Sequence, residues 1–134
     1  MPKTILQKAV FRTSPGRLYE LYMNARLHQA FTGMPVKVQK KVGSPFQAFG
    51  RMLSGKILHL VPGRTIVQTW RSVNFRKSDP DSILILNFSK VKGGAQIELV
   101  HVGVSDQDYL GVKKGWPKYY WKPLARYLSK PGRG

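Results

Sequence analysis

The sequence has 134 residues, the size of one domain, and at this length a folded chain buries about two-thirds of the surface that its unfolded state exposes. It contains no cysteine, which excludes disulfides, thiolate catalysis and sulfur-ligated zinc. Lys and Arg number 23 against 6 Asp and Glu, and this net charge of +17 predicts attraction to nucleic acid, acidic protein or anionic lipid.

The first third of the chain predicts one strand and two short helices. Residues 4–12 mix apolar and polar side chains and predict the strand. Ser14 followed by Pro15 is typical of a helix start, because serine caps a free N–H and proline fits the first turn. Asn24 predicts the cap of a second helix that ends at residues 32–33. The buried sides of the two helices would consist of Leu18, Leu21, Tyr22, Ala25, His28 and Phe31.

Glycine and proline divide the region after Gly33 into short apolar segments that are typical of strands. The predicted strands are residues 36–40, 46–49, 52–60, 65–73, 83–91 and 95–104. A parallel pair needs a crossover of about a dozen residues or more, and the connections here are shorter, so neighbouring strands should be antiparallel. The pattern indicates a six-stranded meander that follows the first strand and the two helices.

The C-terminal segment predicts a long helix with an aromatic face and a basic face. The apolar face would hold Tyr109, Val112, Trp116, Tyr120, Leu124 and either Tyr127 or Leu128, and the basic face Lys114, Lys118, Lys122, Arg126 and Lys130. Because proline suits only a first turn, Pro117 predicts that the regular helix begins near residue 115 or 116, after a looser turn or short helix over 105–114. Pro123 predicts a kink or an early stop, and the apolar spacing that continues through Leu128 favours a kinked helix.

No candidate for catalysis or metal binding is strong. The three histidines, His28, His59 and His101, fall on different predicted elements and show no metal-ligand spacing. Glu98 and His101 are the one acid–base pair, but residues three apart on a regular strand point to opposite faces unless a bulge intervenes. Residues 50–57 nearly match a phosphate-binding loop, yet the required helix is replaced by a predicted strand. We therefore expect a binding domain without metal or cofactor rather than an enzyme.

Neither a membrane-spanning segment nor a signal peptide is recognisable. No apolar run approaches the length of a bilayer span, and the N-terminal residues lack the apolar core of a secretory signal. These features predict a cytoplasmic protein, with one domain over residues 1–130 and a flexible tail over 131–134.

Several separated motifs together resemble a known family. They are Thr13-Ser-Pro15, Gln29-Ala-Phe-Thr32, Ser54-Gly-Lys56, Leu60-Val-Pro62, Trp70-Arg71, Gly115-Trp116 and Tyr119-Tyr120. In this order the sequence resembles the homologous domain of the activators of the heat-shock-protein-90 ATPase, which also occurs as free-standing bacterial and archaeal proteins. The resemblance extends from about Ile5 to Leu128. Gly16 and Arg17 stand where relatives often have acids, and the N-terminal half of the eukaryotic co-chaperones has no counterpart here.

The resemblance implies an α+β helix-grip fold, shared with START-like and birch-pollen-allergen-like proteins. In this fold a curved antiparallel sheet wraps around a long C-terminal helix and encloses an apolar cavity. The implied cavity residues are Trp70, Leu84, Leu86 and His101 from the sheet and Trp116, Tyr119, Tyr120 and Leu124 from the helix. Relatives of this fold bind lipids, sterols or polyketides, and a few catalyse reactions on them.

Besides catalysis by Glu98 and His101 on a molecule bound in the cavity, three functions remain open from the sequence. The first is non-catalytic binding of a small hydrophobic molecule in the cavity. The second is a co-chaperone-like interaction with an acidic protein such as a heat-shock chaperone, through Arg71, Lys114, Lys118, Lys122 and Arg126. The third is weak, salt-sensitive binding of nucleic acid by the basic surface. We expect a monomer or a weak dimer.

Overall fold

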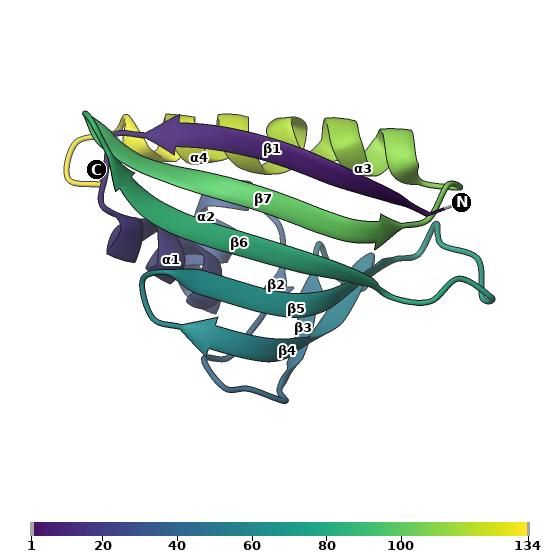
Figure 1. Ribbon diagram of the computed structural model, residues 1–134. Helices are drawn as coiled ribbons and strands as arrows, with labels where there is room; N and C mark the ends of the chain where they lie inside the picture. Colours follow the sequence, from purple (N-terminus) through teal and green to yellow (C-terminus); the bar gives the residue numbers. More distant parts are fainter. Residues whose placement is uncertain (1, 134) are drawn as a thin grey trace.

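The computed structural model describes residues 2–133, and within them a single sheet wraps around a helical layer (Figure 1). The strands are β1 (Lys3–Phe11), β2 (Val36–Lys37), β3 (Pro45–Ala48), β4 (Leu53–Val61), β5 (Thr65–Ser72), β6 (Ser82–Val91) and β7 (Gly94–Val104). The helices are α1 (Pro15–Met23), α2 (Ala25–Thr32), α3 (Tyr109–Trp116) and α4 (Lys122–Leu128), with a π-helical turn (Pro117–Trp121) joining the last two.

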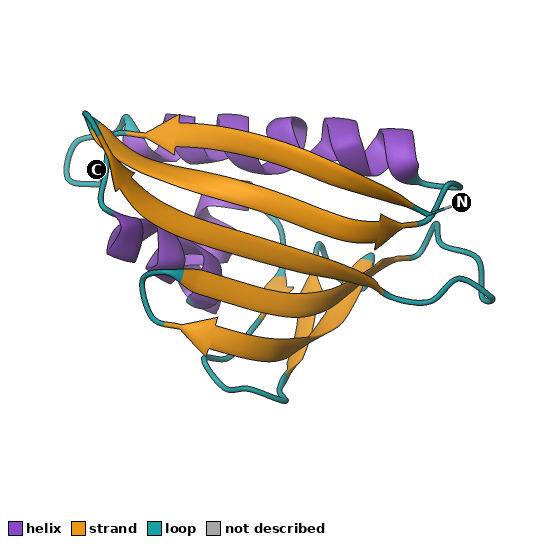
Figure 2. Ribbon diagram, viewed as in Figure 1, coloured by secondary structure: helices purple, strands orange, loops and turns teal. Residues whose placement is uncertain are grey.

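The described strands form one seven-stranded antiparallel sheet in the order β1-β7-β6-β5-β4-β3-β2. Strands β2 to β7 are the predicted meander, and β1 joins its β7 edge. The long helix formed by α3, the π-helical turn and α4 runs along one face of this sheet (Figure 2). This is the predicted α+β helix-grip arrangement, and the sequence prediction of the fold is confirmed.

The hydrophobic core lies between the sheet and the helices. Side chains of β6 and β7 alternate between buried and partly exposed positions, as expected when one face of a sheet is covered. The predicted apolar stripe of the helix is buried at Val112, Trp116, Tyr120, Leu124 and Leu128. Helices α1 and α2 complete the core, because α1 packs against β6 and β7 and α2 packs against α4 and β2.

The helix begins earlier than predicted, because Pro117 lies inside it rather than in its first turn. Proline has no N–H, so the carbonyl of Lys113, four residues earlier, loses its helical partner. The side chain of Gln7 on β1 replaces that partner, since its Nε2 donates to the Lys113 oxygen at 2.9 Å. Oε1 of Gln7 also accepts a hydrogen bond from Nε1 of Trp121 at 2.7 Å. One glutamine thus connects the edge strand to the helix at two places.

Pro123 neither ends the helix nor interrupts its buried face. A π-helical turn precedes it, in which the N–H of Lys122 bonds to the carbonyl of Pro117, one residue further back than in an α-helix. After this turn α4 continues to Leu128, as the apolar spacing predicted. The strand predicted at 36–40 is shorter, because only Val36 and Lys37 pair with β3.

Arg133 lies 4.3 Å from the ring centroid of Tyr127. Gly134, the last residue of the predicted tail, is outside the described residues. Within residues 2–133, no helix has the length and apolar character needed to cross a bilayer.

Candidate functional site: a cleft between the sheet and the C-terminal helix

A partly open cleft of about 300 Å³ lies between α3, the π-helical turn and the β3–β5 part of the sheet. Its lining consists of Met34, Phe49, Met52, Leu53, Trp70, Ser72, Asn74, Asp108, Gly111, Val112, Gly115, Trp116, Tyr119 and Tyr120. The lining is largely apolar. This volume is at the lower end of the range typical of small-molecule sites, about 300 to 1,000 Å³.

The cleft has room because two glycines on the helix face it. Gly111 and Gly115 are four residues apart, so they lie on one side of α3 and contribute no side chain to the space between helix and sheet. A Cβ at Gly115 would lie 3.5 Å from Cδ2 of Tyr119, which is an ordinary contact. A Cβ at Gly111 would lie only 2.9 Å from Oδ1 of Asp108. The absence of a side chain at Gly111 therefore allows the Asp108 carboxylate to lie against the helix.

Aromatic side chains form one end of the cleft. Phe49, just after β3, packs with its ring centroid 5.9 Å from that of Tyr119 and 5.6 Å from that of Tyr120. Its backbone has a φ of 58°, a left-handed conformation that is unfavourable for a residue with a bulky side chain. The N–H of Phe49 donates to the carbonyl of Pro35 at 2.7 Å, which helps to hold this conformation. Tyr119 is 43% exposed, so its ring lies at the mouth.

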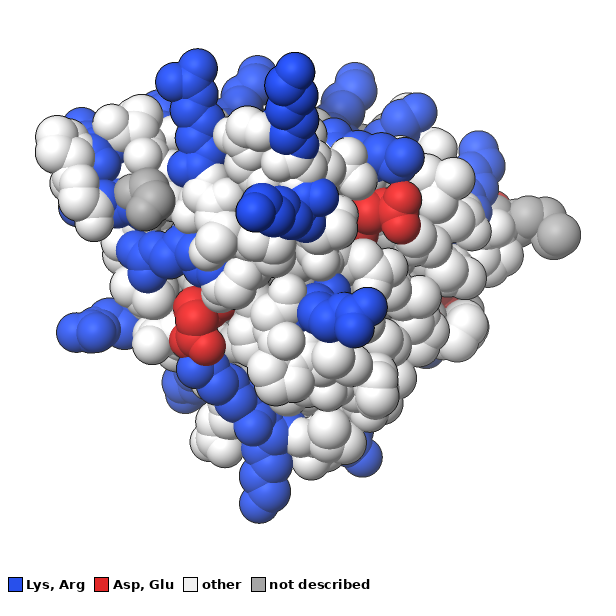
Figure 3. Space-filling model, turned by 60° about the vertical axis from the view of Figure 1, so that its left-hand side comes forward, with Lys and Arg blue, Asp and Glu red and all other residues white. Residues whose placement is uncertain are grey.

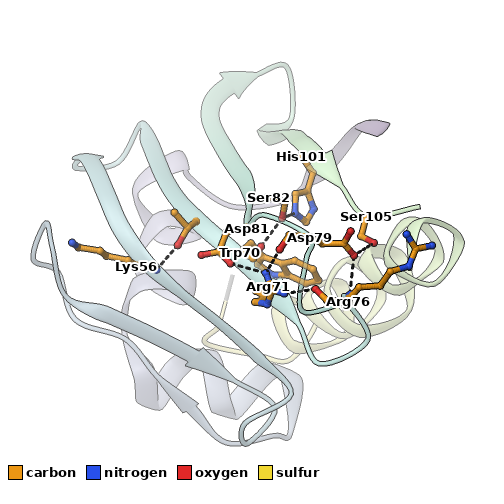
Figure 4. Close-up of polar contacts among 10 residues, drawn as sticks. Lys56, Trp70, Arg71, Arg76, Asp79, Asp81, Ser82, His101 and Ser105 are labelled. Atoms are coloured by element: carbon orange, nitrogen blue, oxygen red, sulfur yellow. Dashed lines mark hydrogen bonds and ion pairs between the residues drawn. The ribbon is translucent and has the colours of Figure 1, made fainter. Parts of the chain in front are cut away.

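The other end of the cleft is polar. Nδ2 of Asn74, in the β5–β6 loop, lies 3.5 Å from Oδ1 of Asp108, which immediately precedes α3. A second contact joins the same two segments, because Ser105 donates from Oγ to Oδ2 of Asp79 at 2.6 Å (Figure 4). This hydrogen bond is the largest cause of the lowered pKa of Asp79. The β5–β6 loop is therefore fastened to the turn before α3 beside the cleft.

Trp70 supplies the cleft wall with an unsatisfied donor. Its side chain is 5% exposed and lines the cleft from β5. Among the described side chains, its indole Nε1 is the one buried nitrogen or oxygen atom with no hydrogen-bond partner. Leaving a buried donor without a partner costs about 1–3 kcal/mol.

His101 supports the wall from behind. Nε1 of Trp116 can only donate, and it lies 3.2 Å from Nδ1 of His101, so Nδ1 must accept. Nε2 of His101 then donates to Oγ of Ser82 at 2.9 Å, and Ser82 donates to the carbonyl of Trp70 at 2.6 Å (Figure 4). Burial lowers the pKa of His101 to about 3, so the ring is neutral at pH 7. This chain of hydrogen bonds fixes the two tryptophans that line the cleft.

His28 fixes Tyr120 in a similar way. Nδ1 of His28 donates to the carbonyl of Tyr22 at 2.9 Å, and Nε2 therefore accepts from the hydroxyl of Tyr120 at 2.9 Å. Burial lowers the pKa of His28 to about 4 and raises the pKa of Tyr120. The hydroxyl of Tyr120 thus already has a protein partner.

Only part of the predicted cavity set lines the cleft. Trp70, Trp116, Tyr119 and Tyr120 do so. Leu86 and Leu124 border a separate space of about 10 Å³, deeper in the core. Leu84 and His101 are fully buried core residues.

The sequence analysis missed the polar end and Phe49, because no local pattern shows where the loops meet. It also missed the two glycines. Spacing could have indicated Gly111 and Gly115, which fall on the same helical side as Tyr119.

The structure brings no catalytic group to the cleft from the predicted pair. Glu98 lies on the outer face of β7, with Oε2 3.8 Å from Nζ of Lys8, whereas His101 is buried on the inner face. The two residues are on opposite faces, as the strand spacing predicted. Gly55, in the segment that resembles a phosphate-binding loop, lies within β4, where a Cβ would clash with the Thr69 carbonyl at 1.9 Å. Close strand packing accounts for this glycine.

The predicted partner-binding residues divide into two groups. Lys114, Lys118, Lys122 and Arg126, here called the basic stripe, are exposed on the helix, and within residues 2–133 none of them forms an ion pair. Arg71 is engaged internally, since it donates to the carbonyls of Asp79 and Arg76 and to Oδ1 of Asp81 (Figure 4). Lys and Arg side chains cover the surface widely, and acidic side chains on the face in Figure 3 are few and separated.

Comparison with known proteins identifies the family. The model of the family described as "Activator of Hsp90 ATPase homolog 1-like protein" matches residues 12–129. The chain belongs to this family. The human activator of 90 kDa heat shock protein ATPase homolog 1 is 30% identical over 132 residues, which are 96% of this chain and 38% of that protein. A Dictyostelium discoideum homologue is 28% identical over 87% of this chain and 30% of its own length. This member of the Hsp90 ATPase activator-like family thus spans only about a third of the length of those relatives.

Solved structures show the same fold. A crystal structure of an HSP90 activator from Plasmodium falciparum matches with a TM-score of 0.85 and 20% identity, covering 96% of this chain and 97% of that one. The solution structure of the Aha1 dimer from Colwellia psychrerythraea matches with a TM-score of 0.77 and 14% identity, covering 98% and 99%. These matches agree with the helix-grip fold predicted from the sequence.

Proposed function

We propose that this protein binds a small hydrophobic molecule in the cleft and is not an enzyme. The observation that carries the proposal is the cleft itself, about 300 Å³ of largely apolar space between the helix and the sheet. A share of about 30 Å³ per water molecule corresponds to roughly ten non-hydrogen atoms of ligand. The walls are preformed, because the hydrogen bonds of His101 and His28 hold Trp116 and Tyr120 in place.

The polar groups of the lining support a ligand that is not purely apolar. Asn74 and Asp108 stand at one end of the cleft, and the hydroxyl-bearing side chain of Tyr119 lies at the other. A site with a few polar groups among aromatic walls is typical of recognition of an apolar body with a polar substituent.

Native mass spectrometry and thermal-shift measurements with panels of lipids and polyketides test the proposal. The matched variants are Gly115→Leu, which adds a side chain on the cleft side of the helix, and Gly16→Leu, whose site is exposed at the start of α1 with nothing within 4 Å of an added Cβ. We expect binding by the wild type and Gly16→Leu and weaker binding by Gly115→Leu. The proposal fails if nothing binds the wild type, or if all three bind alike.

A second candidate function is action on a heat-shock chaperone ATPase, and family membership favours it. The curated relatives are described as activators of the 90 kDa heat shock protein ATPase, although this chain spans only part of their length. We propose that the basic stripe would contact an acidic surface of such a chaperone, because complementary charge speeds and orients association.

A chaperone ATPase assay tests this candidate. The wild type should raise the ATPase rate, and a variant with Glu at the four positions of the basic stripe should lose the effect. A control variant with four charge reversals at exposed lysines elsewhere, Lys41, Lys56, Lys90 and Lys92, should retain most of it. An unchanged rate with the wild type removes the candidate.

A further inference from the structure

The charges in the cleft lining differ from those of the rest of the molecule. The sequence has 23 basic and 6 acidic residues, yet the lining contains one acid, Asp108, and no Lys, Arg or His. A molecule entering the cleft therefore meets a carboxylate in its wall, although the protein as a whole attracts anions. The local charge favours the opposite class of ligand from the one that the net charge predicts.

The polar and apolar groups are separated along the length of the cleft. Asp108 and Asn74 are at one end, and Phe49 and Tyr119 pack together at the other. Tyr119 is eleven positions after Asp108, and at a helical rise of 1.5 Å per residue this corresponds to about 16 Å. Between them Gly111 and Gly115 leave the helix side of the cleft open. A ligand that fills the cleft would place its two ends in different environments.

The start of α3 would ordinarily attract an anion, because its free N–H groups carry partial positive charge. Asp108 already stands at this position, and Gly111 leaves space for its Oδ1. A ligand carboxylate would be repelled there, whereas an amine or a hydroxyl group could donate to the Asp108 oxygens.

Resting on the proposed binding function, we infer that the ligand carries a hydrogen-bond donor, an amine or a hydroxyl group, at one end of an elongated apolar body, and that Asp108 recognises that end. The apolar body lies along Trp70 and Trp116 toward Phe49. A carboxylate drawn to Lys118, whose Nζ lies 5.2 Å from the ring centroid of Tyr119 at the opposite end, is the competing outcome.

A set of probes with the same ten-carbon chain and different end groups tests the inference. Decylamine, 1-decanol and decanoate are titrated into the protein by calorimetry, in a buffer of physiological salt that screens the general surface charge. We expect decylamine and 1-decanol to bind at least about tenfold more tightly than decanoate, because the Asp108 carboxylate attracts or accepts from the first two and repels the third.

Two variants that each remove one negative charge test whether Asp108 causes the preference among the probes. Asp108→Asn retains a side chain suited to the start of a helix and should reduce the preference for decylamine over decanoate to about twofold or less. Glu98→Gln removes a carboxylate from the outer face of the sheet and should leave the preference unchanged.

Equal binding of the three probes, tighter binding of decanoate, or an unchanged preference in Asp108→Asn overturns this inference and leaves the binding function standing. If none of the probes and none of the panel compounds binds, both proposals fall.

Discussion

The two halves of the C-terminal helix face the same sheet, yet only one of them is closely packed. Around α4 and the π-helical turn, side chains from α1, α2, β6 and β7 leave a space of about 10 Å³, here called the packed half. Around α3, here called the cleft half, about 300 Å³ stays open. Leu124 and Trp121 fill the first region, whereas Gly111 and Gly115 face the second. A difference of a few side chains on one helix is enough to turn a core into a candidate binding site.

The comparison also shows where rigidity comes from. Each half contains a buried, neutral histidine that holds an aromatic residue of the helix: His28 holds Tyr120, and His101 holds Trp116. The cleft is therefore open without being loosely held, which is what a preformed site requires.

Lowering the pH should have the largest effect on the free energy of unfolding, because both halves contain a buried neutral histidine. Burial lowers the pKa of His28 from 6.5 to about 4 and the pKa of His101 to about 3. Below pH 6.5 the unfolded chain therefore binds more protons than the folded chain, so stability falls as the pH falls toward 3 and is fully present above 6.5. At about 1.4 kcal/mol per pKa unit, the full loss in free energy of unfolding is on the order of 3 kcal/mol for His28 and 5 kcal/mol for His101.

Urea unfolding at a series of pH values measures this loss. A free energy of unfolding that stays constant from pH 7 to pH 4 would contradict the assignment of both histidines as neutral.

A substitution in the packed half should cost more than a similar one in the cleft half. Leu124→Ala removes a side chain that is 3% exposed and should lower the free energy of unfolding by about 3 kcal/mol. Met52→Ala, at a lining residue that is 51% exposed, should cost less than about 1 kcal/mol. Chemical denaturation of the two variants checks the difference, and equal losses would show that the two halves are packed alike.

The two hydrogen bonds of Gln7, which connect the helix to β1, should contribute about 1–2 kcal/mol to the free energy of unfolding. Gln7→Ala leaves the Lys113 carbonyl and the Trp121 indole N–H without their partners. Gln96→Ala, on the outer face of β7, is the matched control and should be nearly neutral. If the two glutamine variants have the same stability, the side chain of Gln7 does not compensate for Pro117.

The smallest of these effects should be an increase in stability. Gly115→Ala should stabilise the protein by about 0.5–1 kcal/mol, because alanine loses less backbone entropy in a helix and its Cβ makes only an ordinary contact with Tyr119. Thermal unfolding measures the gain. A lower midpoint would mean that the space beside Gly115 cannot take even a methyl group.

The sequence predicted the fold well because its signals are periodic or local. Alternation in residues 83–91 and 95–104 placed the strands within one residue of β6 and β7, and the aromatic spacing placed Trp116 and Tyr120 in the core. The predicted start of the helix was wrong. The prediction at Pro117 could not include the hydrogen bond that Gln7 donates to the Lys113 carbonyl, because the two residues are 106 positions apart.

The candidate site was only partly predictable for the same reason. Trp70, Trp116, Tyr119 and Tyr120 could be proposed from pattern and resemblance. Asp108 and Asn74 meet only through the packing of a loop on a helix start, and no local pattern shows that contact.

The three indole N–H groups offer the most direct test of the claim that the cleft is a binding site. Nε1 of Trp116 is bonded to His101 and Nε1 of Trp121 to Gln7, whereas Nε1 of Trp70 has no partner among the described residues. In a titration with 1-decanol followed by ¹H–¹⁵N NMR, the indole signals of Trp70 and Trp116 should shift and that of Trp121 should shift least, because Trp70 and Trp116 line the cleft and Trp121 does not. Three unchanged indole signals, or a shift confined to Trp121, would contradict the account.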